Sequence, residues 1–250
     1  MTSAVIEQRD RFRIGRVLGD SFAVIGRNFI LCFGVALVFL GLPRFLIKFT
    51  AWKWLAGLEQ HAPQRMVFAV AAGLIAMVLA AVLQAALVRV AIEDLNGKRP
   101  ATRDCIGTAL SVLLPAIGIS LLTTLGAALG LLLLIVPGII LFLRWSAAAP
   151  VLVQERRGVF ASMARSSDLT EGSRWALLGL WVIVIVAASA MELVMARILP
   201  AVGAIAALSL DALDTTLIYM LSSILPAVSY VELRRVKEGA SVDELAEIFS

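Results

Sequence analysis

Leu129–Trp175 reads LGLLLLIVPGIILFLRWSAAAPVLVQERRGVFASMARSSDLTEGSRW, and this stretch decides the fold. An apolar run meets a Pro-Gly pair, Pro137-Gly138, which is typical of a turn. A second, shorter apolar run follows and carries one arginine, Arg144. A charged patch and a short amphipathic segment come next, before a new apolar run begins at Trp175. The pattern predicts a hairpin of two membrane helices followed by a helix that lies on the membrane surface.

The composition of the whole chain indicates that lipid is the solvent for much of it. Hydrophobic residues make up 60% of the 250 residues and charged residues 16%, whereas soluble domains are about 45–50% apolar and about 25% charged. The net charge of +4 arises from basic residues in the loops between apolar runs, where they meet lipid headgroups. Because aromatic residues do not alternate with these charges, we expect no nucleic-acid partner. Cys32 and Cys105 fall in separate segments, so we expect no disulfide.

Working outward from the central stretch, the apolar runs predict an all-α protein with six transmembrane helices, paired as three hairpins. The hairpins cover 29–92, 113–153 and 174–233 within one membrane domain, 29–236. The fourth span, 138–153, has 16 residues and would reach only about 24 Å, less than the ~30 Å hydrocarbon core. Gly126 and Gly130 in the third span form a GxxxG motif, which suits a dimer face or close packing within the chain.

Amphipathic segments flank the hairpins and predict helices in the membrane interface. The N-terminal segment 1–28 lacks the compact apolar core of a cleavable signal and instead predicts a surface helix or an extension of the first span. The predicted surface helices are 14–27, 101–112, 159–169 and 241–249. The last lies within the C-terminal segment 237–250, and a capping box at Ser241 marks its start.

The end of each hairpin repeats one pattern. An acidic residue, basic residues and a glycine precede an amphipathic segment in IEDLNGKRPATRDCIG, VQERRGVFASMARS and VELRRVKEGASVDELAEIF. Two interpretations stay open: a true structural repeat, whose axis would follow the membrane normal, or the ordinary character of inner-membrane loops. Of the 22 Lys and Arg residues, 17 fall by chain order on the side that holds both termini. The positive-inside rule then predicts a cytoplasmic N-terminus and C-terminus.

Arg144 is the one arginine that the sequence cannot place in a loop. A charge at mid-membrane depth costs about 2.5–3.5 kcal/mol on insertion scales, so it should face a partner. Glu192 lies at similar depth in the fifth span, and Asp211 and Asp214 are second choices. Alternatively, Arg144 reaches the headgroups or binds an anion there.

The residues around the central turn resemble a known family. They are Pro137, Gly138, Trp145, Glu155, Gly158, Ser166, Thr170 and Gly172. The pattern is similar to the membrane domain fused to some bacterial glycerophosphodiester phosphodiesterases, and to the YciC-like inner-membrane proteins. It departs at Ile140, where the pattern has an aromatic residue. The resemblance implies a bacterial inner-membrane location and carries no activity, since the catalytic domain is absent and phosphodiesterase chemistry needs several histidines.

Three classes of function remain. The first is a non-enzymatic module that packs against lipids, other membrane proteins or a second copy and supports envelope or lipid homeostasis. The second is a transporter or channel, which needs polar residues along a path. Its candidate residues are Gln84, Thr123, Thr124, Arg144, Glu192, Asp211, Asp214, Ser222 and Ser223. An intramembrane enzyme is the least favoured, because no metal-ligand or nucleophile motif is present and His61 is the only histidine. We expect no cofactor.

Overall fold

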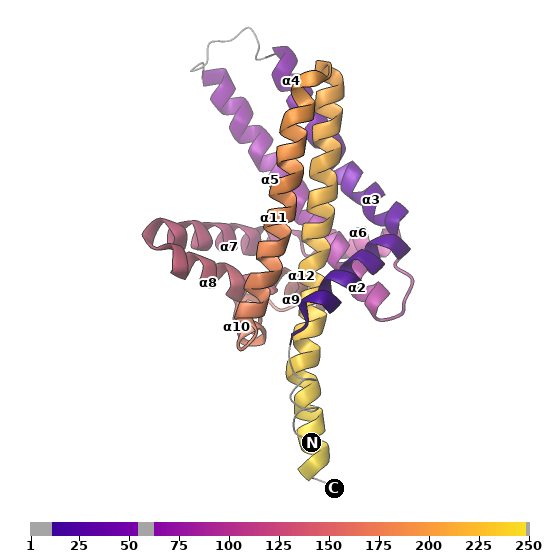
Figure 1. Ribbon diagram of the computed structural model, residues 1–250, viewed down its shortest axis with the longest axis vertical. Coiled ribbons are helices and arrows are strands. Elements are labelled where there is room, and N and C mark those ends of the chain that lie inside the picture. Colours follow the sequence, from indigo (N-terminus) through magenta and orange to yellow (C-terminus); the bar gives the residue numbers. More distant parts are fainter. Residues whose placement is uncertain (1–11, 55–62, 249–250) are drawn as a thin grey trace.

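The computed structural model describes residues 12–54 and 63–248. The described residues form helices and no strand (Figure 1). In chain order these are α2 (Ile14–Arg27), α3 (Phe29–Ala36), a π-helical turn (Leu37–Gly41), α4 (Leu42–Trp54), α5 (Pro63–Leu95), α6 (Thr102–Ser111), α7 (Leu113–Leu133), α8 (Ile135–Trp145), α9 (Ala148–Glu155), α10 (Val159–Thr170), α11 (Arg174–Ile198), a 3₁₀ turn (Leu199–Ala201) and α12 (Ala204–Ile248). His61, predicted to be a solvated loop residue, lies outside the described residues.

Six helical stretches are long and apolar enough to cross a membrane, which confirms the predicted all-α polytopic fold. They are Phe29–Trp54, Pro63–Leu95, Leu113–Gly130, Ile135–Glu155, Arg174–Ala201 and Ala204–Gly239. The first continues through Pro43 to Trp54, because the π turn changes the helical register just before that proline.

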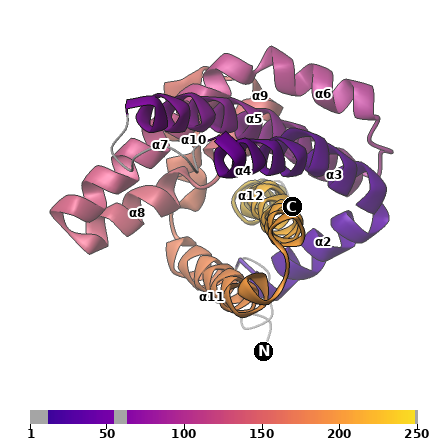
Figure 2. The same ribbon diagram turned by 90° about the horizontal axis from the view of Figure 1, so that it is seen from above.

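The helix α12 is the centre of the bundle. Seen from above, α2, α3–α4, α5 and α11 stand around it (Figure 2). Gly41 of the π turn lies close against it: an added Cβ there would lie 2.6 Å from Oγ1 of Thr216. The buried core occupies one half of the bundle, where 81–92 of α5 packs against α9 and 224–230 of α12. The apolar side chains of the other half are largely exposed, as the surface of spans in lipid is.

The central hairpin differs from the prediction. Both views show α7 and α8 lying across the direction of α11 and α12 rather than alongside them (Figures 1 and 2). The chain turns at Leu134, whose φ of −159° and ψ of 136° are extended, and Pro137 lies inside the first turn of α8. A proline is tolerated there because the first N–H groups of a helix have no intrahelical acceptor. The predicted turn at Pro137-Gly138 is therefore wrong by three residues.

The predicted fourth span is two helices that meet at Ser146 and Ala147. Ser166 of α10 joins them: its hydroxyl donates to the carbonyl of Arg144 at 2.7 Å and accepts from the N–H of Ala147 at 3.2 Å. The break between the two helices leaves the carbonyl of Arg144 and the N–H of Ala147 without helical hydrogen bonds. Ser166 supplies a partner to both, as buried backbone groups require. This break turns α9 into the core and leaves α8 across the bundle.

The GxxxG motif is used inside the hairpin. An added Cβ on Gly130 would lie 2.7 Å from Cα of Gly138, and one on Gly126 would lie 2.5 Å from the ring of Trp145. These contacts match the internal-packing alternative, and they give two residues of the family-like pattern, Gly138 and Trp145, a role in packing.

Three of the predicted surface helices form, and the fourth does not. The helices α2, α6 and α10 match the segments 14–27, 101–112 and 159–169 to within one residue. Their inward faces are buried, including Val17, Cys105 and Met163. In contrast, α12 runs through Gly239 to Ile248 without interruption, so no separate helix begins at Ser241. A capping box directs a helix start only where the preceding residues leave the helix.

Both cysteines are free thiols and buried, in agreement with the expected lack of a disulfide. Burial raises the pKa of the Cys105 thiol in α6 to about 11. The thiol is therefore protonated at physiological pH and behaves as a small apolar core residue.

Candidate functional site

Three charged side chains meet within the spans. Asp211 of α12 accepts two hydrogen bonds at the same carboxylate oxygen, from Nε of Arg44 at 3.0 Å and from Nζ of Lys48 at 2.7 Å. Arg44 and Lys48 are four residues apart on α4, so they lie on one face of that helix. Because charged residues within spans are costly unless paired, this cluster ties the first span to the last.

The cluster borders a cavity of about 370 Å³ between α4, α11 and α12. Two more carboxylates line it, those of Glu192 and Asp214, together with Thr215 and Tyr219. The hydrogen bonds and ion pairs of the described residues include none to Glu192 or Asp214. When all groups are ionised, the cavity is thus lined by three negative side chains and one positive side chain, that of Arg44, while Lys48 binds Asp211 from outside the lining.

The structure corrects the predicted pairing of Arg144 with Glu192. Arg144 donates from Nε to the hydroxyl of Ser167 on α10 at 2.8 Å, and its side chain is exposed. Glu192 is too far along the bundle: α8 contacts α11 at Trp181, whose ring is 5.1 Å from that of Phe142, and Glu192 lies about 16 Å further along α11. The prediction gave Arg144 and Glu192 similar depths in two membrane spans, whereas α8 lies across the bundle (Figure 1).

The carboxylates chosen from the sequence do converge, but their basic partner is different. Glu192, Asp211 and Asp214 line one cavity. The arginine that binds one of these carboxylates, predicted to be Arg144, is Arg44, which pairs with Asp211. In the sequence, Arg44 follows Pro43 near the end of the first apolar run, which indicates a kink or an early end of that span. Two signals in the sequence could have identified Arg44. Arg44 and Lys48 are four residues apart, which places them on one face of a helix. Trp52 and Trp54 follow them, and tryptophans are typical of the membrane interface at the end of a longer span.

The other polar residues proposed for a transport path do not line this cavity. Gln84, Thr123, Thr124, Ser222 and Ser223 lie elsewhere on their helices. Thr216, close by in α12, donates its hydroxyl to the carbonyl of Ala212, as hydroxyls in membrane helices commonly do. The described residues contain no group of three His, Cys, Asp or Glu side chains placed to hold a metal ion.

A second set of charges lies at what we call the basic end of the bundle, the end that carries the ion-paired residues Arg16, Arg27, Arg165 and Arg234. Here the acidic residue of each repeated pattern binds an arginine of a surface helix. Asp94 pairs with Arg27 of α2, Glu155 with Arg165 of α10, and Glu232 with Arg16 of α2. The three patterns therefore share a structural role, which is to fasten surface helices to the ends of spans.

These pairs differ in burial. Glu232 is only 5% exposed and accepts from Arg16 at 3.2 Å. The Arg27 guanidinium is more exposed, and its hydrogen bond to Asp94 raises its pKa above the ordinary value. Glu155 also accepts from the hydroxyl of Tyr230 at 3.1 Å, and this bond joins α9 to α12. Arg165 also pairs with Glu238, so α10 is held by both neighbours.

The remaining family-like residues have local structural roles near this end. Gly158 precedes α10 as its N-cap residue. Thr170 is buried at the end of α10 and donates its hydroxyl to the carbonyl of Ser167. Gly172 has a φ of 84°, which favours glycine in the turn before α11. Together with the pairs of Glu155, they fix the surface helix α10 between two membrane helices.

The six apolar helices, the charges paired at their ends and the lipid-type exposed surface define a multi-pass α-helical membrane protein. Over 78 residues the chain is 32% identical to a UPF0259 membrane protein of Pectobacterium carotovorum subsp. carotovorum (strain PC1). The match covers 31% of this chain and 31% of that protein. No protein-family model matches the chain, and neither does any solved structure. The match concerns a membrane protein and gives no support to the phosphodiesterase resemblance, which stays a prediction.

Proposed function

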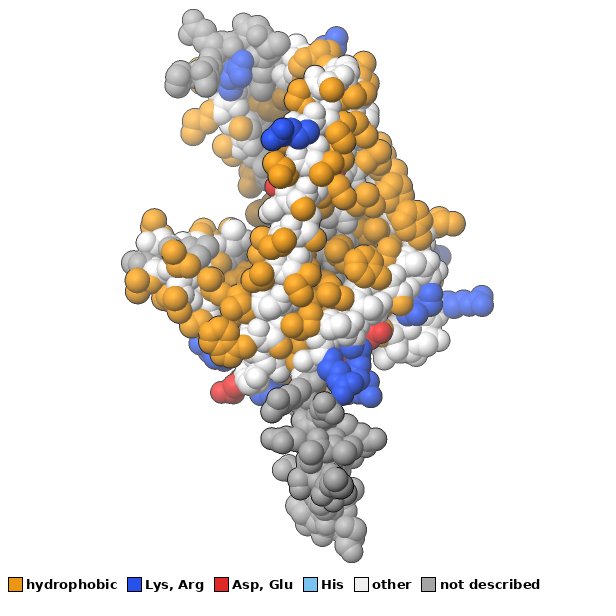
Figure 3. All heavy atoms as spheres, viewed as in Figure 1, with side chains coloured by type: hydrophobic (Ala, Val, Ile, Leu, Met, Phe, Trp, Pro, Cys, Tyr) orange, Lys and Arg blue, Asp and Glu red, His pale blue; other side chains and the backbone are white. Residues whose placement is uncertain are grey.

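We propose that this chain is a non-enzymatic, YciC-like module of the bacterial inner membrane that contacts lipids of one leaflet and supports envelope or lipid homeostasis. The observation that carries the proposal is the position of the α7–α8 hairpin. It lies across the bundle near the basic end and has its apolar side chains exposed (Figures 1 and 3). At its tip, Leu132 is 82% exposed and Leu134 68% exposed.

A hairpin in this position contacts lipid in a different way from a span. A crossing helix meets each leaflet over half its length, whereas a helix that lies in the plane of one leaflet meets that leaflet over its whole length. The ion-paired surface helices α2 and α10 lie near the same end and supply arginines at headgroup level. Membrane lipids are therefore the partners that the proposal names first, ahead of other membrane proteins or a second copy.

The charged groups of the basic end support a non-catalytic role. Glu155 and Glu232 are engaged by arginines, and Glu155 also by Tyr230, which suits a scaffold more than an acid or base that must exchange protons. The proposal includes no cofactor.

The cavity beside Asp211 favours a second candidate function, transport of a small solute. Glu192 and Asp214 present carboxylates to it, and among the described residues neither makes an ion pair, although Arg44 lies on the same cavity. A solute or proton pathway uses such groups within spans.

Complementation separates the two candidates. In a bacterium whose copy of this gene is deleted, we expect the wild-type gene to restore envelope dye exclusion and phospholipid composition. The Glu192→Gln and Asp214→Asn variants should restore both, because a lipid-contacting module does not use their charge. Leu132→Asp, which places a charge on the hairpin tip, should restore neither. If the cavity variants fail while present in the membrane at wild-type levels, transport is the better description.

The orientation is a further part of the proposal: both termini are cytoplasmic, as the distribution of Lys and Arg predicts. In a variant without Cys32 and Cys105, single cysteines report the side of the membrane. An impermeant thiol reagent added to intact cells from outside should label Gly203→Cys, in the turn between α11 and α12. It should not label Leu134→Cys, because the hairpin enters and leaves on the cytoplasmic side. Labelling of Leu134→Cys at the rate of Gly203→Cys would show that the hairpin crosses the membrane.

A further inference from the structure

An apolar groove runs between α8 and α11 at the basic end. It has a volume of about 390 Å³ and is lined by Val136, Ile139, Ile140, Leu143, Arg174, Trp175 and Leu178. Six of these side chains are apolar, and the arginine is the only charge. Trp175, at the edge of the groove, is 86% exposed. Tryptophan is favoured at the level of lipid headgroups, so the edge of the groove has the character of a membrane interface.

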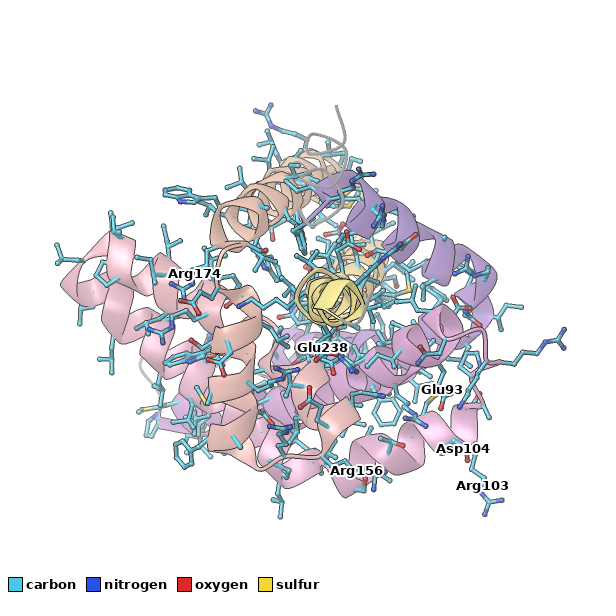
Figure 4. The ribbon with its side chains drawn as sticks, turned by 90° about the horizontal axis from the view of Figure 1, so that it is seen from below. Glu93, Arg103, Asp104, Arg156, Arg174 and Glu238 are labelled. Atoms are coloured by element: carbon cyan, nitrogen blue, oxygen red, sulfur yellow. The ribbon has the colours of Figure 1, made fainter. Side chains whose placement is uncertain are left out.

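Arg174 carries an uncompensated positive charge at this place. It is the first residue of α11, where the helix dipole is positive and an acidic residue would be favoured. Its Nε atom is buried and has no hydrogen-bond partner in the structure. The N-cap residue Ser173 makes no capping bond with its side chain. Figure 4 shows Arg174 between the foot of α11 and the α7–α8 hairpin. A group that binds here should be an anion.

We propose that the groove binds an anionic glycerophospholipid, with its phosphate on Arg174 and one acyl chain along the apolar wall of α8. The positive charge of Arg174 complements the anionic headgroup, and the apolar lining of the groove suits an acyl chain. Arg144 lies one turn beyond Ile140 on α8 and is exposed, so it adds positive charge to the same end of the groove. The inference rests on the proposed function, since it requires the hairpin to lie among the lipids of one leaflet.

Native mass spectrometry of the purified chain in detergent tests this site. The protein is titrated with phosphatidylglycerol or phosphatidylcholine of the same acyl chains, and the affinity of the first bound lipid is compared. We expect phosphatidylglycerol to bind more tightly. Arg174→Gln should lower that affinity by about fivefold, the effect of one basic residue near an anionic lipid surface. Arg103→Gln is the matched control, because Arg103 is exposed on α6 and points away from the bundle (Figure 4).

Two further variants keep the test decisive. Arg174→Lys retains the charge and should keep the preference, which guards against a loss caused by misfolding of Arg174→Gln. Ile139→Trp fills the groove and should weaken binding of both lipids. Equal effects of Arg174→Gln and Arg103→Gln would overturn the site, and so would displacement of phosphatidylglycerol by millimolar inorganic phosphate, since that indicates a plain anion site. A lost lipid preference in these titrations leaves the complementation result untouched, so failure of the site and failure of the proposed function are distinguishable.

Discussion

Gly130→Leu should open the α7–α8 hairpin and lower the stability of the protein by about 1–3 kcal/mol, the range seen when extra bulk is forced into a packed interior. The atoms in the way are Cα of Gly138 at 2.7 Å and its N at 3.0 Å from the position of a new Cβ. Because both belong to the backbone, no rotamer change makes room, and the two helices must separate. The measurement is thermal unfolding of the purified protein in detergent, followed by circular dichroism.

Gly73→Leu is the matched control. Gly73 lies on α5, and apart from the adjoining backbone of that helix no atom of the described residues lies within 4 Å of the position of its Cβ. The same substitution there adds apolar surface that faces lipid and should leave the unfolding temperature nearly unchanged. If the two variants unfold alike, the close contact between Gly130 and Gly138 does not hold the hairpin together.

The helices themselves could be predicted from the sequence, because a helix in lipid needs only a long apolar run and a basic loop gives its end. The surface helices α2, α6 and α10 were predicted for a related reason: each has one apolar face, and that face is buried against the bundle. Both signals are local, and they do not depend on how distant segments pack.

The direction of α7 and α8 could not be predicted in this way. A helix that is apolar on all sides has the same sequence whether it crosses the membrane or lies within one leaflet. What sets the direction is the break at Ser146, and that break is stabilised by Ser166, twenty residues later, on another helix. The short length of the predicted fourth span was the one hint of it.

The ion pairs were missed for a similar reason. Depth within the membrane, counted along straight spans, paired Arg144 with Glu192. Because α8 lies across the bundle, the position of a residue along α8 does not give its depth in the membrane. For α4, α11 and α12 the position along the helix still gives the depth. This is why the three carboxylates of α11 and α12 do meet on one cavity, while the arginine that faces them is Arg44 from the first span.

Asp211→Asn should have the second large effect, because it leaves Arg44 and Lys48 within a span without the carboxylate that they share. Losing one partner of a fully buried pair costs about 3–5 kcal/mol. Here the side chains of Arg44 and Lys48 are about two fifths exposed, so solvent or headgroups offset part of the loss, and we expect about 1–2 kcal/mol. The measurement is the fraction of folded protein in the membrane together with its unfolding temperature in detergent.

Glu192→Gln is the control within the same cavity, because Glu192 makes no ion pair in the structure and its neutralisation should be nearly silent. A triple variant, Asp211→Asn with Arg44→Gln and Lys48→Gln, removes the stranded positive charges along with the carboxylate. It should recover part of the stability that Asp211→Asn alone loses, since the cost of that variant lies mainly in the unpaired cations that remain. A triple variant less stable than Asp211→Asn would mean that Arg44 and Lys48 stabilise the first span through contacts other than Asp211, and the cluster would then not be what joins the first span to the last.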